Sequence, residues 1–93
     1  FESNQYKWIK NDLETSTKKW KIILLHKPGW SAGKHTNEAE VQNIIQPLAV
    51  ENGVQFIFAG HNHNYSRAVA NKTVHITTGG GGAPLYDINA SWP

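Results

Sequence analysis

Two histidines one residue apart, His61 and His63, are the residues of this chain best suited to chemistry. They follow the apolar run of residues 54–59, and Gly60 separates the run from the pair. Neutral imidazole is a common metal ligand in proteins, and the end of a strand holds such a ligand firmly. A third histidine, His26, ends another apolar run. The sequence therefore predicts a metal site to which these three imidazoles contribute.

The remaining histidines have plainer interpretations beside any chemical one. His35 lies in a loop, where histidines are common, so a structural role and a role in catalysis both stay open. His75 alternates within an apolar and threonine-rich segment, which is typical of a sheet residue without chemistry. The three proposed metal ligands also have interpretations without a metal. His61 and His63 could be turn residues, and His26 could be a strand-end side chain bonded to the backbone.

The first elements predicted along the chain are a helix and a strand. Residues 4–18 are predicted to be helical, because apolar side chains recur at helical spacing and Ser3 or Asn4 can cap the start. The apolar face of this helix would comprise Trp8, Ile9 and Leu13. Residues 20–25 are predicted to form a buried strand that ends directly before the first metal-site histidine.

A second helix and a second strand follow. Asn37 with Glu40 three residues later is typical of a helix start. Pro47 would clash inside one continuous helix, so a break or kink is expected there. Gly53 is expected to cap the end of the helix. The apolar run of residues 54–59 is then predicted to be the second buried strand.

The last predicted elements are the strands 65–70 and 73–78, joined as a hairpin that turns at residues 71–72, followed by a loop over the glycine run 79–82. Strands alternating with helices favour a mixed α/β sheet. A strand–helix–strand unit makes its two strands parallel, with a right-handed crossover. Their carboxyl ends would then lie at one edge of the sheet, where α/β folds commonly place their sites.

Composition limits the classes of protein to which the chain can belong. It has 93 residues, a formal net charge of +2 and 39% hydrophobic residues, which fits one small domain or a piece of a larger one. The absence of cysteine excludes disulfide frameworks and thiolate zinc sites. The lysines are dispersed, so we expect no nucleic-acid partner. The longest apolar runs are about six residues, against roughly twenty for a membrane span, so we expect no membrane segment.

The order of motifs resembles the second half of a calcineurin-like metallophosphoesterase, and most closely its purple acid phosphatase branch. The resemblance covers about residues 1–86 and includes a helix around Gln5–Ile9 ahead of the first histidine strand. It rests mainly on four features: the run Leu25-His26-Lys27-Pro28, Trp30-Ser31 with His35, the stretch 58–67 around Gly-His-Asn-His, and the glycine-rich segment 79–85.

The resemblance implies a role for each of four histidines. His26 and His61 correspond to ligands of a second, divalent metal, and His63 to a ligand of the first metal, which is iron(III) in the purple enzymes. His35 corresponds to a catalytic histidine that binds no metal, faces the substrate, and positions or protonates the phosphate ester. The implied cofactors are two metal ions, iron together with zinc, manganese or iron, and the implied substrate is a phosphate ester.

One departure from the family concerns the carboxylates. The family carries earlier aspartate motifs and an asparagine–histidine pair, whereas the only aspartates here are Asp12 and Asp87. A two-metal site needs a bridging carboxylate to hold its cations about 3.5–4 Å apart. Residues 1–93 are therefore interpreted as the C-terminal part of a catalytic domain, namely half of a β-sandwich with a mixed sheet flanked by helices. The N-terminal half would be its missing partner.

Two functions of different class remain. In the first, the chain is half of a hydrolase of phosphate esters that is inactive alone and acts, by resemblance, in a secreted or periplasmic protein. In the second, it is a non-enzymatic metal-binding or structural remnant that keeps three histidines. The chain begins at Phe1 without an initiator methionine, which is interpreted as processing or a partial sequence.

Overall fold

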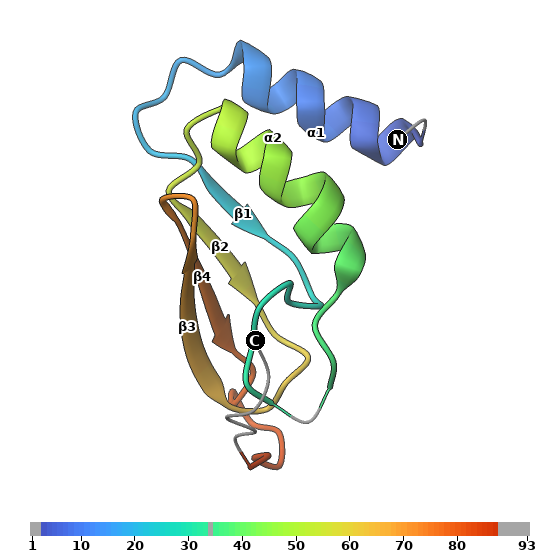
Figure 1. Ribbon diagram of the computed structural model, residues 1–93, viewed down its shortest axis with the longest axis vertical. Coiled ribbons are helices and arrows are strands. Elements are labelled where there is room, and N and C mark those ends of the chain that lie inside the picture. The colour runs from blue at the N-terminus through green and yellow to red at the C-terminus, as the bar shows by residue number, and fades with distance from the viewer. Residues whose placement is uncertain (1–2, 34, 88–93) are drawn as a thin grey trace.

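Four strands form one mixed sheet in the computed structural model, which describes residues 3–33 and 35–87. The order of the strands across the sheet is β1-β2-β4-β3 (Figure 1). Their bounds are β1 Ile22–Leu24, β2 Phe56–Ala59, β3 Tyr65–Ala70 and β4 Thr73–Thr78. The mixed α/β architecture predicted from the sequence is therefore confirmed.

The predicted parallel pair of the first two strands and the predicted hairpin are confirmed, and the parallel pairing of β2 with β4 is an addition. β1 pairs with β2 in parallel, β2 pairs with β4 in parallel, and β3 pairs with β4 antiparallel. The hairpin turns at Asn71 and Lys72, whose φ angles of 48° and 72° give the left-handed turn that a two-residue hairpin requires. Because β1 and β2 are parallel neighbours, their carboxyl ends lie at the same edge of the sheet.

The strand predicted over residues 20–25 is shorter and less buried than expected. Only Ile23 of β1 is buried, whereas Leu24 is 78% exposed and Ile22 and Trp20 are also exposed. A continuous apolar run was interpreted as a strand covered on both faces. Among the described residues, the helices cover only one face of the sheet, so the side chains on the other face face outward.

Helix α1 spans Asn4–Thr15 and therefore ends before residue 18, the predicted limit. The predicted N-cap is confirmed, because the Ser3 side chain accepts a hydrogen bond from the Tyr6 N–H at 3.1 Å. The Thr15 hydroxyl donates to the Asn11 carbonyl, and Ser16 adopts an extended conformation that stops the helix. Hydroxyl side chains compete for backbone groups in this way, which is why they favour helix ends.

The apolar face of α1 differs from the predicted face by one aromatic residue. Leu13 is buried and Ile9 packs against the core, as expected. Trp8 was expected on the same face but is 64% exposed, and Tyr6 packs against the core instead. Helical spacing alone therefore placed the tryptophan one position away from the face that the sheet covers.

The second helical segment changes its winding before Pro47. Residues 41–45 form a π-helix, η1 (Val41–Ile45), and α2 (Gln46–Glu51) follows directly. The Gln46 N–H donates to the Val41 carbonyl five residues back, so the chain enters the proline through a wider turn. The interruption expected at Pro47 is confirmed in this form. Gly53, with φ of 67°, follows the helix as predicted.

The hydrophobic core lies between the two helices and one face of the sheet (Figure 1). Its buried members are Leu13, Ile23, Leu48, Ala49, Val54 and Ile57. The opposite face carries large apolar side chains that are more than half exposed, namely Ile22, Leu24, Tyr65 and Val69. The described residues thus form two layers, helices on a sheet, with one face of the sheet left apolar and uncovered.

Candidate metal centre

His26 and His61 meet at the carboxyl edge of the sheet. The pairing of β1 with β2 continues past both strands, because the Gly60 N–H donates to the His26 carbonyl at 2.9 Å. The segments that carry His26 and His61 therefore lie side by side, just beyond the ends of β1 and β2. His26 Nε2 lies 3.2 Å from His61 Nδ1. The structure thus brings together two of the three histidines that the sequence placed in a metal site.

A tight turn after β2 aims the His61 side chain at its partner. His61 has φ of 67°, a left-handed conformation that costs free energy for a residue with a Cβ. The next N–H, that of Asn62, donates back to the Gly60 carbonyl at 2.7 Å. Such conformations persist only where the surrounding structure holds them, and they are concentrated at functional sites.

The separation of the two nitrogens fits a shared cation. Imidazole nitrogens bind zinc at about 2.0–2.1 Å, so two of them on a tetrahedral ion lie about 3.4 Å apart. The observed 3.2 Å between His26 Nε2 and His61 Nδ1 is close to that value. The two nitrogens are therefore spaced as two ligands of one divalent transition metal would be. Within residues 3–33 and 35–87, no group of three or more His, Asp or Glu side chains is arranged to hold a metal ion.

His63 points toward the loop that follows the glycine run. Its Nδ1 lies 2.7 Å from the Pro84 carbonyl oxygen, so this nitrogen carries the proton and donates it. The ring stacks on Tyr86 with centroids 4.0 Å apart. A backbone bond at one nitrogen fixes the tautomer and leaves Nε2 with a lone pair, which is the usual support of a metal-ligating histidine.

His35, from the loop between β1 and η1, stacks on His61. The ring centroids lie 3.9 Å apart and the planes are inclined by 27°. Partial burial lowers the pKa of His61, and positive charge on His35 or His26 lowers it further. A lowered pKa keeps the His61 imidazole neutral near pH 7, and the neutral form is the one that binds a metal.

Sequence reasoning missed two residues of the site, Tyr86 and Asn62. Tyr86 lies between His63 and His35, at centroid distances of 4.0 and 5.6 Å. Asn62 is completely buried and bonds to the backbone of His35. Its burial arises from the tight turn after β2 and from contacts with the loop before η1, and the sequence pattern carries no signal for either.

The fifth histidine takes no part in the site. His75 is 3% exposed, its Nε2 lies 2.7 Å from Gln46 Oε1, and its ring packs edge-on against Trp30. The role predicted for it, a sheet residue, is confirmed. At the start of the glycine run the backbone packs closely, because a Cβ at Gly79 would lie 2.1 Å from the Asn62 carbonyl oxygen, whereas a Cβ at Gly81 or Gly82 would meet nothing within 4 Å.

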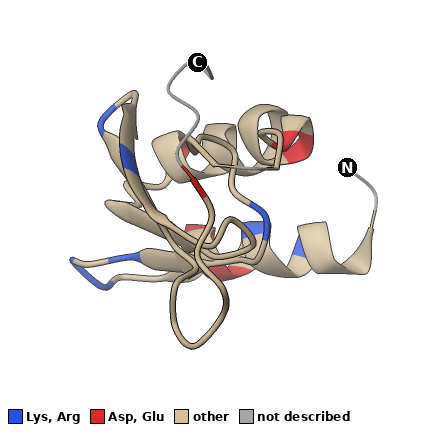
Figure 2. Cartoon of the chain, turned by 90° about the horizontal axis from the view of Figure 1, so that it is seen from below, with Lys and Arg blue, Asp and Glu red and all other residues tan. Residues whose placement is uncertain are grey.

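Charged residues are spread over several elements of the chain (Figure 2). Lysines and arginine occur on the helix, on the loops and at the hairpin, and acidic residues lie among them. In the part of the chain that the structure describes, none of the helices has the length and apolar content that a membrane crossing requires.

Known proteins of similar sequence are purple acid phosphatases. Purple acid phosphatase 18 of Arabidopsis thaliana is 37% identical over 93 residues, which cover 86% of this chain and 21% of that protein. Purple acid phosphatase 1 of Ipomoea batatas is 37% identical over 71 residues, covering 71% of this chain and 15% of that protein. The chain thus spans about a fifth of the length of the relatives it matches.

Two solved structures share the fold of this chain, and one of them is a purple acid phosphatase. A purple acid phosphatase from yellow lupin seeds superposes with a TM-score of 0.85 at 25% identity, over 98% of this chain and 21% of that one. GAP50, the anchor in the inner membrane complex of Plasmodium, shares the fold with a TM-score of 0.75 at 22% identity, over 92% and 29% of the two chains. The family model for the calcineurin-like phosphoesterases matches residues 1–65. This chain therefore belongs to the calcineurin-like phosphoesterase family and is most similar to its purple acid phosphatase branch.

Proposed function

We propose that this chain supplies part of the two-metal site of a phosphoesterase that hydrolyses phosphate esters. The observation that carries the proposal is the pair of imidazoles, His26 and His61, which face each other across the ends of two parallel strands at 3.2 Å. Membership of the calcineurin-like phosphoesterase family and the similarity to purple acid phosphatases support it.

Three histidines would hold the metals. His26 through Nε2 and His61 through Nδ1 would hold the second, divalent metal, and His63 through Nε2 would hold the first metal, which is iron in the purple enzymes. The second metal would then be zinc, manganese or iron. When bound, the two cations polarise the phosphoryl oxygens and lower the pKa of the water that attacks phosphorus. The bridging carboxylate and the other ligands come from outside residues 1–93.

His35 would act on the substrate rather than on a metal. Its ring lies against His61 at a centroid distance of 3.9 Å, which places it beside the proposed metal ligands. An imidazole in that position can hold the ester in place by a hydrogen bond. In its protonated form it can give the proton to the leaving oxygen as the ester bond breaks.

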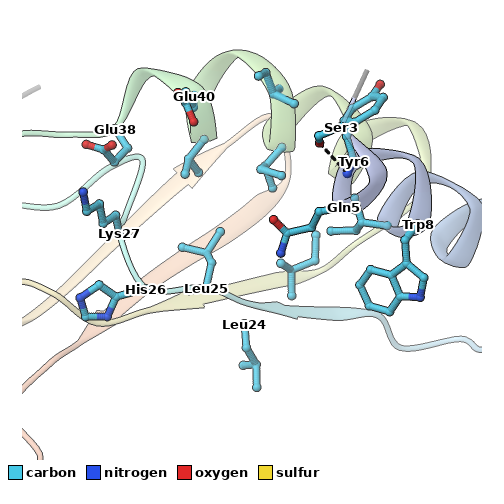
Figure 3. Close-up of a pocket in the computed structure, with 15 residues that line it drawn as sticks. Ser3, Gln5, Tyr6, Trp8, Leu24, Leu25, His26, Lys27, Glu38 and Glu40 are labelled. Atoms are coloured by element: carbon cyan, nitrogen blue, oxygen red, sulfur yellow. Dashed lines mark hydrogen bonds between the residues drawn. The ribbon is translucent and has the colours of Figure 1, made fainter. Parts of the chain in front are cut away.

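The rest of the catalytic domain would cover the surfaces that this chain leaves apolar. One is the sheet face with Ile22 and Leu24, and the other is a groove of about 530 Å³ between α1, β1 and η1. Figure 3 shows that Trp8 and Leu24 lie at this groove, and that His26 lies at its border just beyond the end of β1. Since relatives are about five times as long as the matched segment, we propose that the N-terminal half of the catalytic domain is the missing partner.

The same resemblance leads us to propose that the protein is secreted or periplasmic. Detection of the protein outside the cytosol of its own cells would support this proposal. Confinement to the cytosol would contradict it and would leave the proposed chemistry unaffected.

The test of function is hydrolysis of a chromogenic phosphate monoester by the full-length protein that contains this sequence. We expect turnover that is lost on dialysis against a chelator and restored by iron together with zinc or manganese. A protein that binds these metals and hydrolyses neither a monoester nor a diester would be the non-enzymatic module. Hydrolysis that continues unchanged after the metals are removed would also contradict the proposal.

A further inference from the structure

Asn62 stands between the two histidines of the loop after β2, and it is completely buried. Its side-chain amide makes three hydrogen bonds to Ser31 and His35, which lie between β1 and η1. Oδ1 accepts from the His35 N–H at 2.7 Å, and Nδ2 donates to the His35 carbonyl at 3.3 Å and to Ser31 Oγ at 3.1 Å. The amide thus pairs with both backbone polar groups of His35, as a neighbouring strand would.

Gly33 and Gly79 pack closely against Asn62 and restrict its side chain to the observed orientation. A Cβ at Gly33 would lie 2.4 Å from Asn62 Cγ, and a Cβ at Gly79 would lie 2.1 Å from the Asn62 carbonyl oxygen. Contacts this short do not occur between real atoms, so these two positions suit only glycine. Close packing on both sides holds the amide in the orientation that the hydrogen bonds require.

The loop between β1 and η1, to which Asn62 is hydrogen-bonded, is also attached to the rest of the fold. The Ser31 N–H donates to Asn37 Oδ1 at 2.9 Å, and Ser31 Oγ lies 3.1 Å from Ser66 Oγ on β3. Trp30 in the same loop packs on His75 of β4. The amide therefore joins two loops that are each attached to the sheet. Its hydrogen bonds consequently fix the position of His35 relative to the sheet.

We propose that Asn62 is a positioning residue that holds His35 against His61 and so sets the proton donor relative to the metal ligands. His61 contacts His26 and the adjacent Asn62 bonds to His35, so the turn that carries the proposed metal ligand also holds the proposed proton donor. The catalytic consequence rests on the proposed function, because it requires His35 to act on a phosphate ester. A displacement of about 1 Å in a catalytic group can cost about 10²-fold in rate.

The kinetic test uses Asn62→Ala and the nearly isosteric Asn62→Asp in the full-length protein. We expect kcat to fall about 10²-fold while the bound metal is retained. In a His35→Ala background, the same substitutions should cost no further rate, because a residue that acts only through His35 has nothing left to position. A loss by the same factor in both backgrounds would overturn the proposal, since a general structural defect predicts that result. If Asn62→Ala does not fold, Asn62→Asp decides alone.

Asn64 offers a matched control. It is the same residue type, follows His63, is nearly buried, and donates through Nδ2 to the Ala32 carbonyl at 3.1 Å. Any effect of Asn64→Ala on kcat should be equal in the wild-type and His35→Ala backgrounds.

A second readout does not depend on activity. Hydrogen exchange of the His35 amide should be about tenfold faster in Asn62→Ala, because its acceptor is gone, and unchanged in Asn64→Ala. If the wild-type protein hydrolyses no ester, the proposed function fails, and this measurement still decides whether Asn62 holds His35. An unchanged exchange rate in Asn62→Ala would overturn the positioning role.

Discussion

His35 and His61 lie in van der Waals contact, yet the roles proposed for them differ: one donates a proton and the other binds a metal. The distinction gives a residue-scale prediction. His35→Ala in the full-length protein should lower kcat about 10²–10⁴-fold, as for a lost general acid, and leave the metal content unchanged. Steady-state kinetics combined with metal analysis checks it. Loss of a metal ion in His35→Ala would show instead that this histidine is a ligand.

Gly79 gives a prediction about packing. Gly79→Ala would press a methyl group onto the Asn62 carbonyl oxygen, so the variant should lose about 1–3 kcal/mol of unfolding free energy. Gly81→Ala is the matched control, because a Cβ there meets nothing within 4 Å. Urea unfolding of the two variants measures the difference. Equal stability of both would contradict the close approach between the glycine run and the histidine loop.

Some of the site was readable from residues and some was not. His26, His61 and His63 could be named because each follows a strand, and parallel strands deliver their carboxyl ends to one edge. Asn62 and Tyr86 act through contacts between loops. Such contacts depend on backbone turns like the left-handed His61, which the order of apolar and polar residues does not encode.

At the scale of elements, His75 joins β4 to the start of α2. The hydrogen bond between its Nε2 and Gln46 Oε1 connects the sheet to the helix that follows the π-helical turn, and Gln46 also donates to the Ala70 carbonyl. This link gives the buried imidazole a polar partner, in an interior that also holds the buried hydroxyl side chains of Thr73 and Thr77.

A dependence of stability on pH follows from His75. Burial lowers its pKa below the usual 6.5, so the folded state resists protonation while the unfolded state does not. The stability is fully present above about pH 6.5 and falls as the pH drops from there toward the lowered folded-state pKa, because the unfolded state then binds more protons.

Urea midpoints at pH 7.5 and 5.5 check this expectation. The wild type should lose more stability across that range than His75→Gln, which keeps a hydrogen-bonding side chain but cannot titrate. Because the two proteins differ only at residue 75, the quantity of interest is the difference between their pH dependences. Parallel pH dependence in the two proteins would mean that His75 does not contribute.

The order and direction of the elements were predictable, and their burial was not. Strand–helix–strand alternation predicted the parallel pair, and the two-residue turn at Asn71 and Lys72 predicted the hairpin. Pro47 predicted the interruption, though not that a π-helical turn would absorb it. The predictions that β1 is buried and that Trp8 packs on the core were wrong. Burial depends on which layer covers a side chain, and the local sequence does not encode that layer.

At the scale of the whole molecule, the uncovered face of the sheet is the main surface feature. If the other half of a sandwich covers it, Leu24→Lys in the full-length protein buries an unpaired charge and should cost several kcal/mol, of the order seen when such charges are buried. Val50→Lys on α2 is the control, a 44% exposed apolar residue outside this face, and should change stability by about 0.5 kcal/mol or less. Equally small effects would place the Leu24 face in water and contradict the proposed second half.

The central claim is that His61 holds a metal on which hydrolysis of a phosphate ester depends. The most direct test is the metal content of His61→Ala in the full-length protein, measured together with its rate on a chromogenic monoester. We expect two metal ions per wild-type chain, loss of at least one of them in the variant, and a rate lower by several orders of magnitude. A His61→Ala protein that keeps both metals and nearly full activity would contradict it.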